Sequence, residues 1–285
     1  MSIKRKQAEN IASVLVEGMP YIQRFSGKKI VIKYGGAAMS EENLKKGFAR
    51  DIALMKLVGM LPIVIHGGGP QIGHELKKKK IETKFINGYR VTDEKTMKVV
   101  KKILGREINK EIVDLIDSFG GKAKTLSWFN SNLLKASKLI HEEDLGLVGK
   151  VDSVRTSDIN KVLRKEYIPI ISPIGKDKSG NCLNINADLV AGKIASTIKA
   201  EKLILLTDVS GVQDKKGSVL SKISTYEAKK LLKTDTIKGG MSPKLSSSLE
   251  SINEGTKSAH IIDGRVPHAV LLEVLTDDGV GTLIS

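Results

Sequence analysis

The sequence predicts an α/β protein whose mainly parallel sheet is covered by helices on both faces. Strand-like and helix-like segments alternate along most of its 285 residues, the order typical of parallel sheets. Two runs of β-branched residues end abruptly in glycines, at Ile30–Gly36 and Pro62–Gly69. Glycines at the carboxyl edge of a parallel sheet let backbone N–H groups approach an anionic ligand. The pattern therefore indicates an enzyme that handles phosphate or carboxylate groups.

The composition is that of a globular protein with one large domain or two coupled lobes. Hydrophobic residues make up 40% and charged residues 28% of the chain, which argues against disorder. No stretch reaches the roughly 18–20 apolar residues of a membrane span, and the N-terminus does not resemble a signal sequence. Cys182 is the only cysteine, so no internal disulfide can form and a zinc cluster is excluded. We expect a cytoplasmic protein that does not engage a membrane.

The net charge of +15 raises the question of nucleic-acid binding. The lysines are dispersed along the chain, however, and aromatic residues, which would stack on bases, amount to only 4%. We therefore expect no nucleic-acid partner and relate the basic character to anionic small substrates.

Apolar residues recur at helical spacings between about residues 7 and 24, which predicts an amphipathic helix. Gly18 and Pro20 are expected to break or kink it. Because this segment precedes the first core strand, we assign residues 1–27 to a helical extension outside the sheet. Its apolar stripe consists of Ile11, Val14, Leu15 and Ile22.

The core elements then follow in order. In the first half we predict strands at 30–34 and 62–66, helices at 41–58 and 70–80, and a helix from about 94 to 118 with Thr92 as its N-cap. Residues 122–165 contain shorter strands without a clear pattern. In the second half we predict strands at 168–172, 202–207, 259–262 and 270–274, and helices at 188–199, 225–233 and 243–254. The turn KDKSGN at 176–181 suggests a division into lobes 28–180 and 181–285.

Lys33 stands in an otherwise apolar strand directly before Gly35 and Gly36. A lysine there is costly unless its ammonium group meets an anion or reaches solvent at the strand end, and the adjacent glycines favour phosphate binding. The second turn, HGGGPQIG at 66–73, is either a structural tight turn or a backbone site for a carboxylate or phosphate. It fits a dinucleotide fingerprint poorly, and His66 is interpreted as a hydrogen-bonded histidine at a strand end rather than a catalyst.

Four further residues stand at promising positions. Arg90 lies in a glycine-containing loop before a helix, where its planar guanidinium could clamp a carboxylate or simply face solvent. Asn184 precedes a helix and could bind a ligand or take part in capping. Asp208 follows a buried strand, and Lys244 follows a glycine pair at a helix start. The histidines form no HExxH motif and no Ser-His-Asp spacing, so no metal site is expected.

The ordered set of motifs resembles the amino acid kinase family, and within it the members that phosphorylate N-acetylglutamate. Residues 33–244 contain, in order, KYGG, HGGGPQI, GYRVTD, NINADLVAG, LLTDVSGV and GGMSPK, and the tail 260–284 continues the similarity. The resemblance implies a three-layer α/β/α sandwich around a largely parallel eight-stranded sheet. It also implies that the lobe 28–180 binds N-acetylglutamate and forms dimer contacts, and that the lobe 181–285 binds ATP.

The resemblance further implies a role for each matching residue. Lys33 and Lys244 would flank the transferred phosphoryl group, and Asp188 would orient their ammonium groups. The remaining implied positions are Gly68, Gly69, Arg90 and Asn184 for the acceptor, and Gly35, Gly36, Asp208, Gly211 and Gly240 for ATP and its phosphates. ATP with Mg²⁺ would be the co-substrate, with the cation held mainly by phosphate oxygens and water, and no tightly bound cofactor is expected.

This set of residues suits the implied reaction. The acceptor carboxylate, with an ordinary pKa of about 4.3, is already an anionic nucleophile at neutral pH. No general base is needed, and phosphoryl transfer requires in-line positioning and neutralisation of charge on the phosphoryl oxygens. One departure concerns Gly146–Gly149, where the family usually has a GHVG-like turn and this chain has Leu147 instead of the histidine, in a shortened segment.

In this family an extra N-terminal helix accompanies arginine inhibition and a hexamer built as three dimers. Because this chain has about 28 residues before its first strand, we expect a homohexamer that is inhibited by arginine. Glu273, Gly279 and Gly281 match the family's arginine-site segment. The sequence leaves open whether a PII-type signalling protein binds.

Three other functions fit the sequence less well. Glutamate 5-kinases and aspartate kinases usually add domains after the kinase core, whereas this chain stops where the core is expected to stop. A nicotinamide dehydrogenase rests on the loose glycine pattern alone and does not explain the two lysines. A non-catalytic homologue is expected to lack Lys33, Asp188 or Lys244, and all three are present.

Overall fold

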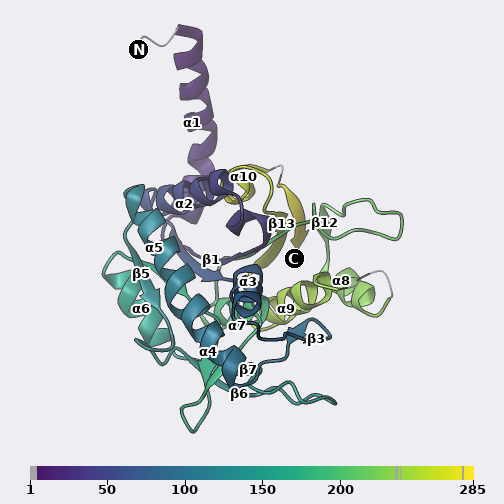
Figure 1. Ribbon diagram of the computed structural model, residues 1–285. Helices are drawn as coiled ribbons and strands as arrows, with labels where there is room; N and C mark the ends of the chain where they lie inside the picture. Colours follow the sequence, from purple (N-terminus) through teal and green to yellow (C-terminus); the bar gives the residue numbers. More distant parts are fainter. Residues whose placement is uncertain (1–4, 235–236, 238, 278) are drawn as a thin grey trace.

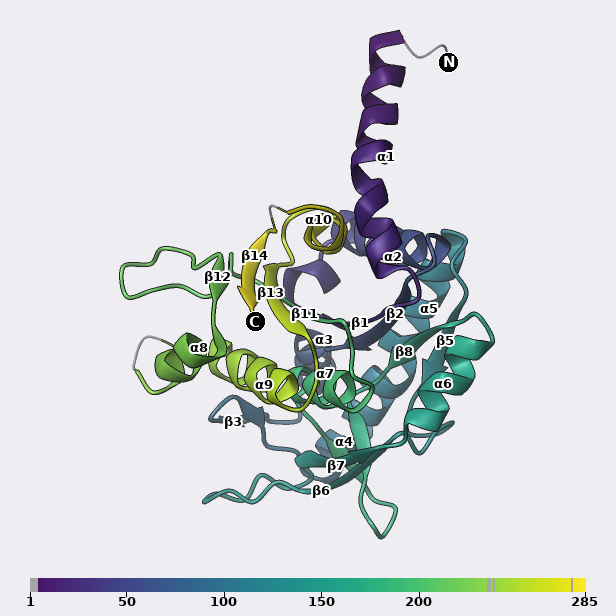
Figure 2. The same ribbon diagram turned by 180° about the vertical axis from the view of Figure 1, so that it is seen from behind.

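The computed structural model describes residues 5–234, 237, 239–277 and 279–285 and confirms the α/β fold class. Its central sheet has eight strands in the order β12-β14-β13-β11-β1-β2-β8-β5 (Figures 1 and 2). All neighbouring strands are parallel except β13 and β14. The strands are β1 (Lys29–Tyr34), β2 (Leu61–His66), β5 (Ala123–Leu126), β8 (Ile168–Ile171), β11 (Lys202–Thr207), β12 (Lys222–Ile223), β13 (Ser258–Asp263) and β14 (Gly281–Ile284).

The predicted helices are present, and helices also form at Thr156–Arg164 and Ala269–Leu275, where none was predicted. The described ones are α1 (Arg5–Phe25), the 3₁₀ turn η1 (Gly36–Met39), α2 (Glu42–Leu57), α3 (Gly69–Lys78), α4 (Glu94–Lys102), the π-helical segment η2 (Ile103–Ile108), α5 (Asn109–Ser118), α6 (Thr156–Arg164), α7 (Ala187–Thr197), α8 (Thr225–Leu232), α9 (Met241–Asn253) and α10 (Ala269–Leu275). The predicted helix 94–118 thus exists as α4, η2 and α5 in direct succession.

Helices cover both faces of the sheet because its strands are apolar on both sides. Ile30 and Ile32 of β1 belong to one hydrophobic core, whereas Val31 between them belongs to the other. Apolar residues of α2, α5 and α10 fill the first core, and those of α6, α7 and α9 fill the second. This arrangement gives the three layers that Figures 1 and 2 show from opposite sides.

Two smaller sheets lie beside the central one and were not predicted. A four-stranded sheet contains β6 (Leu134–Lys138), β7 (Gly149–Val154), β9 (Ile174–Lys176) and β10 (Cys182–Asn184), and the KDKSGN turn joins its last two strands. The second is the hairpin of β3 (Phe85–Ile86) and β4 (Tyr89–Arg90). Asn87 and Gly88 form its tight turn with φ of 49° and 83°, the left-handed conformation that a two-residue hairpin turn favours.

The structure corrects three local predictions. Residues 270–274, predicted as a strand, lie in helix α10, and the strand is β14; a short apolar run does not distinguish the two by periodicity. The N-cap of α4 is Asp93 rather than Thr92, because the Asp93 carboxylate accepts a hydrogen bond from the backbone N–H of Thr96.

The third correction concerns the predicted break at Gly18 and Pro20, because α1 runs through both residues without interruption. A proline removes only one helical hydrogen bond, and the turns on either side continue. The helix projects from the body of the protein (Figure 1), and Val14 and Leu15 are 67% and 65% exposed. The side chain of Ile11 lies outside the described residues. Within the described chain, no helix, α1 included, is long and apolar enough to cross a membrane.

Candidate functional site

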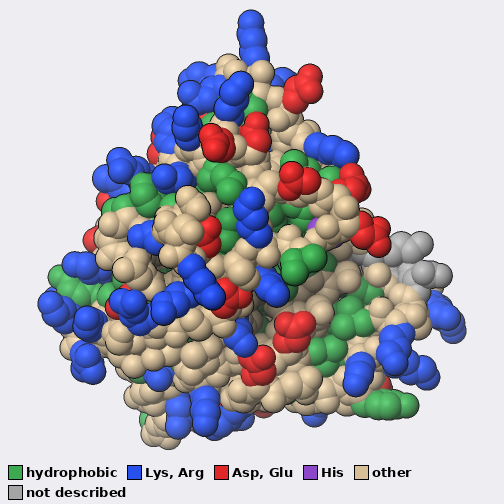
Figure 3. Space-filling view, turned by 90° about the horizontal axis from the view of Figure 1, so that it is seen from below, with side chains coloured by type: hydrophobic (Ala, Val, Ile, Leu, Met, Phe, Trp, Pro, Cys, Tyr) green, Lys and Arg blue, Asp and Glu red, His purple; other side chains and the backbone are tan. Residues whose placement is uncertain are grey.

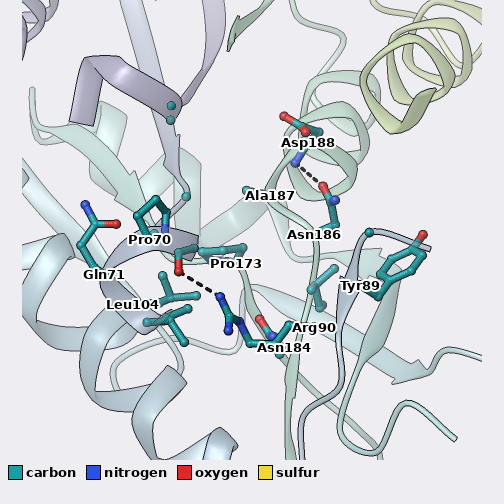
Figure 4. Close-up of a pocket in the computed structure, with 18 of the residues that line it drawn as sticks. Pro70, Gln71, Tyr89, Arg90, Leu104, Pro173, Asn184, Asn186, Ala187 and Asp188 are labelled. Atoms are coloured by element: carbon teal, nitrogen blue, oxygen red, sulfur yellow. Dashed lines mark hydrogen bonds between the residues drawn. The ribbon is translucent and has the colours of Figure 1, made fainter. Parts of the chain in front are cut away.

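The largest group of predicted site residues meets at the carboxyl edge of the central sheet. Strand β1 lies between β2 and β11. The chain continues from β1 to β2 on one side, and β11 is added on the other side much later in the sequence. Such a switch point opens a crevice beyond the strand ends. Here a cavity of about 350 Å³ forms (Figure 4). Its lining includes nine predicted residues: Lys33, Gly35, Gly36, Gly68, Gly69, Arg90, Asn184, Asp188 and Asp208.

Asp188 links the two predicted lysines. Its carboxylate lies 3.2 Å from Lys33 Nζ of β1 and 2.8 Å from Lys244 Nζ of α9. All three residues are buried. Burial raises the pKa of Asp188, but the charges of Lys33 and Lys244 more than offset it and hold that pKa below its ordinary value. The Asp188 carboxylate therefore lies between the two lysine side chains beside the cavity.

The pKa of Lys33 is shifted in the direction expected for a buried ammonium group. Burial lowers the pKa of its ammonium group, and the neighbouring Asp188 carboxylate opposes this effect. Gly35 leaves room for the lysine, since a Cβ there would lie 2.6 Å from Lys33 Nζ. The sequence placed this lysine correctly at the strand end, and the structure shows that it turns toward the cavity rather than into solvent.

Two glycines beside the cavity adopt backbone conformations that side chains disfavour. Gly36 has φ of 66°, and a Cβ there would collide with the Asp208 carboxylate. That carboxylate accepts a hydrogen bond from the backbone N–H of Ala37, which ties the β1 turn to the end of β11. Gly68 has φ of 156°, and a Cβ would lie 2.5 Å from both Ile108 and Leu104. Both turns therefore depend on the absence of a side chain.

Arg90 reaches the cavity from the hairpin. Its Nη2 donates to the Gly69 carbonyl at 2.9 Å (Figure 4), and its Nη1 donates to Thr83 Oγ1 at 2.6 Å. The guanidinium also lies 4.5 Å from the centre of the Phe85 ring. Burial lowers the pKa of Arg90 below its ordinary value, but the group stays charged at neutral pH. Its contacts with Gly69 and Thr83 hold the guanidinium beside the glycine turn.

Asn184 and Asn186 approach from β10 and the start of α7. Asn184 Nδ2 donates to Thr92 Oγ1 at 3.1 Å. Asn186 is the N-cap of α7, because its Oδ1 accepts from the backbone N–H of Asp188 at 2.8 Å (Figure 4). The cap sets the first turn of the helix and so the direction of the Asp188 side chain.

His66 ends β2 and is completely buried. Its Nδ1 lies 2.8 Å from the Gly67 carbonyl oxygen, and its Nε2 lies 3.1 Å from Asn109 Nδ2. Burial lowers its pKa to about 4, so the ring is neutral at neutral pH. The interpretation of His66 as a hydrogen-bonded histidine at a strand end is consistent with these contacts.

Lys244, Gly211 and Gly240 do not line this cavity. Lys244 reaches it through Asp188, as described above. Gly211 lies after the end of β11 with φ of 143° and packs against Thr282, and Gly240 is the N-cap of α9.

Glu273, Gly279 and Gly281 lie at a second cavity of about 630 Å³. Residues of α1 line one side of it. Lys202 at the start of β11 and Ser258 and His260 of β13 line another. The Glu273 carboxylate lies 2.5 Å from His260 Nδ1, and both side chains are buried. Burial lowers the pKa of His260, against the effect of Glu273. Gly281 has a packing role, because a Cβ there would collide with the Ile261 carbonyl of β13.

Several residues of both cavities were missed by sequence reasoning. Asn186, Tyr89 and Phe85 line the first cavity, and Tyr21, Arg24, Lys202 and His260 line the second. The last turn of the N-terminal helix forms part of a cavity, although the sequence predicts only a helical extension outside the sheet. Lys202 at the start of an apolar strand was the one signal comparable to Lys33.

One face of the molecule shows no single basic stripe (Figure 3). On the face shown in Figure 3, Lys and Arg side chains are scattered among Asp and Glu. Among the described residues, no three His, Cys, Asp or Glu side chains are grouped so that they could hold a metal ion.

Known proteins resemble this chain along its whole length. The pattern of the amino acid kinase family matches residues 28–263. An acetylglutamate kinase of Marinomonas sp. (strain MWYL1) is 56% identical over 296 aligned positions, which cover 100% of this chain and 98% of that protein. An acetylglutamate kinase of Hydrogenovibrio crunogenus is 51% identical over 296 positions, which cover 100% and 99%.

Solved structures show the same fold at lower identity. N-acetylglutamate synthase of Neisseria gonorrhoeae superimposes with a TM-score of 0.83 at 22% identity, over 96% of this chain and 63% of that one. This chain therefore spans less than two thirds of the synthase. Carbamate kinase of Giardia lamblia superimposes with a TM-score of 0.66 at 17% identity, over 90% and 98%.

We expect the His66→Asn variant to lose less stability in acid than the wild type. The unfolded chain binds a proton near pH 6.5, whereas folded His66 binds one only near pH 4. Its contribution to stability is therefore full above pH 6.5 and is lost as the pH falls to 4, by about 3 kcal/mol. Denaturant unfolding at several pH values measures the slope. The exposed His74→Asn variant should keep the wild-type slope, and an unchanged slope in His66→Asn would contradict the assignment.

Proposed function

The chain belongs to the amino acid kinase family, and we propose that it transfers the γ-phosphoryl group of ATP to the side-chain carboxylate of N-acetyl-L-glutamate. The product is N-acetyl-L-glutamyl 5-phosphate, formed in the second step of arginine biosynthesis. The observation that most strongly supports this reaction is the group Lys33–Asp188–Lys244 beside the two glycine turns. The full-length similarity to acetylglutamate kinases supports the choice of acceptor.

The site neutralises charge and does not abstract a proton. An acceptor carboxylate with an ordinary pKa of about 4.3 is ionised at neutral pH. Asp188 is held ionised between two ammonium groups, so it orients them instead of acting as a base. Lys33 and Lys244 can then stabilise the charge on the phosphoryl oxygens during in-line transfer.

The two ligands occupy opposite sides of this group in our proposal. Arg90 and Asn184 bind the carboxylate and amide of N-acetylglutamate, and Gly68 and Gly69 donate backbone N–H bonds at the junction with the phosphoryl group. The lobe 28–180 holds this acceptor, and the lobe 181–285 holds ATP. Gly35, Gly36, Asp208, Gly211 and Gly240 belong to the ATP and phosphate side.

Mg²⁺ accompanies ATP as part of the co-substrate. It neutralises phosphate charge when bound. The described residues offer no cluster of side-chain ligands, which fits a cation that is held mainly by phosphate oxygens and water.

ADP formation tests the function directly. The protein is incubated with ATP and Mg²⁺ and, in parallel, with N-acetylglutamate, glutamate, aspartate or carbamate. We expect turnover with N-acetylglutamate and little with the other three. Preference for glutamate or aspartate would indicate a different member of the family, and an absence of turnover with all four would overturn the kinase assignment.

Replacing either lysine should mainly reduce kcat. Lys33→Ala or Lys244→Ala removes one cation beside the phosphoryl group, and a loss of about 10²–10³-fold is expected, as for one oxyanion-hole donor. Steady-state kinetics measure it. Lys193→Ala, on the same helix as Asp188 but paired with Glu254 at the surface, should keep wild-type turnover. Folded lysine variants with near-normal kcat would refute the mechanism.

Arg90→Lys should weaken the binding of N-acetylglutamate and leave ATP nearly unaffected. A lysine cannot reproduce the two-point contact with a carboxylate, nor the two hydrogen bonds to Gly69 and Thr83. Separate titrations of the two substrates measure the effect, with ATP as the internal control. A change confined to ATP would place Arg90 at the other site.

We also propose that arginine inhibits the enzyme and that the enzyme is a homohexamer, a trimer of dimers. The second cavity supports the first point, because the Glu273 carboxylate at its wall can pair with a cationic ligand. Gly279 leaves that carboxylate room, since a Cβ would lie 2.6 Å from it. Tyr21, Arg24 and Phe25 of α1 line the same cavity, which would join the effector to the projecting helix.

Assembly should depend on α1. Val14, Leu15, Val16 and Met19 are half to two thirds exposed, which favours burial against a second copy of the chain. Light scattering and kinase assays of the full chain and of a variant beginning at Gly27, each with and without arginine, measure both properties. The full chain should be an arginine-inhibited hexamer, and the shortened one a smaller, insensitive assembly. A full-length dimer that ignores arginine would end this proposal and leave the kinase function intact.

A further inference from the structure

A buried chain of hydrogen bonds connects the interior of the sheet to the glycine turn after β2. Asn109 is the first residue of α5, directly after the π-helical segment, and is completely buried. Its Nδ2 lies 3.1 Å from His66 Nε2 and 3.1 Å from the carbonyl oxygen of Ile170 in β8. His66 Nδ1 in turn lies 2.8 Å from the Gly67 carbonyl oxygen.

The carbonyl groups at the two ends of this series of hydrogen bonds determine the position of each proton in it. The Ile170 carbonyl can only accept, so the Asn109 amide nitrogen must face it and donate. The second N–H of that amide then points to His66 Nε2, which must accept. A neutral imidazole with an accepting Nε2 has its proton on Nδ1, and that proton is donated to the Gly67 carbonyl. The low pKa of His66 keeps the ring neutral.

The Gly67 carbonyl determines where the next N–H points. The peptide group between Gly67 and Gly68 is planar and trans, so its C=O and N–H point in opposite directions. The carbonyl is directed at the buried His66 ring, and the N–H of Gly68 is therefore directed the other way, on the side of the cavity that both glycines line.

The π-helical segment supports the same peptide from a second direction. Leu104 and Ile108 pack so closely on Gly68 that a Cβ would lie 2.5 Å from each. The extra residue in a π turn changes which side chains face inward, and Asn109 follows immediately after it. The packing of η2 and the hydrogen bonds of Asn109 thus act on one glycine turn.

We propose that His66 and Asn109 are positioning residues, which lock the imidazole with its proton on Nδ1 and so aim the Gly68 N–H at the transferring phosphoryl group. The proposal rests on the proposed kinase function. Neither side chain touches the substrates; both act through the Gly67–Gly68 peptide. Their contribution should appear in kcat, because the aimed N–H stabilises charge that develops during transfer.

A matched pair of variants separates positioning from structural support. In His66→Asn, the shorter amide can still donate to the Gly67 carbonyl from the place of Nδ1, but the bond to Asn109 is lost. In His66→Gln, the longer amide can still accept from Asn109, but the bond to Gly67 is lost. Each variant keeps one of two buried bonds, so the melting temperatures should fall by similar amounts.

The kinetics of the pair should differ. We expect His66→Asn to keep kcat within about tenfold of the wild type, and His66→Gln to lose about 10²-fold, with little change in KM for either substrate. Equal losses of kcat in the two variants, or a loss in His66→Gln that appears only in KM, would overturn the proposal.

The proton position can be measured without any substrate. Solid-state NMR of ¹³C,¹⁵N-histidine-labelled protein should show His66 neutral with its proton on Nδ1, the signal being assigned with His66→Asn. In Asn109→Asp a carboxylate cannot donate to Nε2, so a proton should appear on Nε2 and kcat should fall. A wild-type ring protonated on Nε2 in an active kinase would overturn this inference alone. A wild type with the proton on Nδ1 but no activity toward N-acetylglutamate would overturn the proposed function instead.

Discussion

The buried carboxylate of Asp188 is the interaction on which the arrangement of the site depends. Taking one carboxylate and two ammonium groups out of water is costly unless each finds a partner. Here Asp188 lies within 3.2 Å of Lys33 and 2.8 Å of Lys244, so one anion serves two cations. The three residues come from β1, α7 and α9, and these elements must therefore keep a fixed relation. The two lysine side chains that Asp188 holds beside the cavity are the groups that the proposed reaction requires.

The glycine turns provide the space that this arrangement of charged side chains requires. The carboxyl ends of β1, β2 and β11 meet at one edge of the sheet, where the buried group of charges needs close access to its ligand. Side chains at Gly35, Gly36 or Gly68 would occupy positions already taken by Lys33, Asp208 or η2. Backbone N–H groups can then face the cavity with no side chain between them and an anion.

The sequence allowed most of the central sheet and the first cavity to be predicted, because both depend on local patterns. Apolar runs ending in glycine identify β1 and β2, and a lysine in such a run stands out energetically. The prediction for residues 270–274 is wrong because this apolar run is short. Its sequence suits either a helix or a strand, and its packing decides between them. The hydrogen bond between His66 and Asn109 joins residues 43 positions apart, and no periodicity reveals it. The second cavity likewise combines α1 with β11, β13 and the tail, so its existence follows from topology alone.

The two cavities share strand β11, which explains how they could influence each other. Lys202 at its start lines the second cavity, and Asp208 just after its end lines the first. Six residues of strand span about 20 Å, and Leu203 to Leu206 between them are completely or almost completely buried. Packing this dense leaves the strand little freedom to bend. A ligand in the second cavity would influence binding at the first only if it had different affinities for two conformations of the protein. On one face of the sheet, the contact of His268 Nδ1 with Asp51 Oδ1 at 2.5 Å joins the start of α10 to α2.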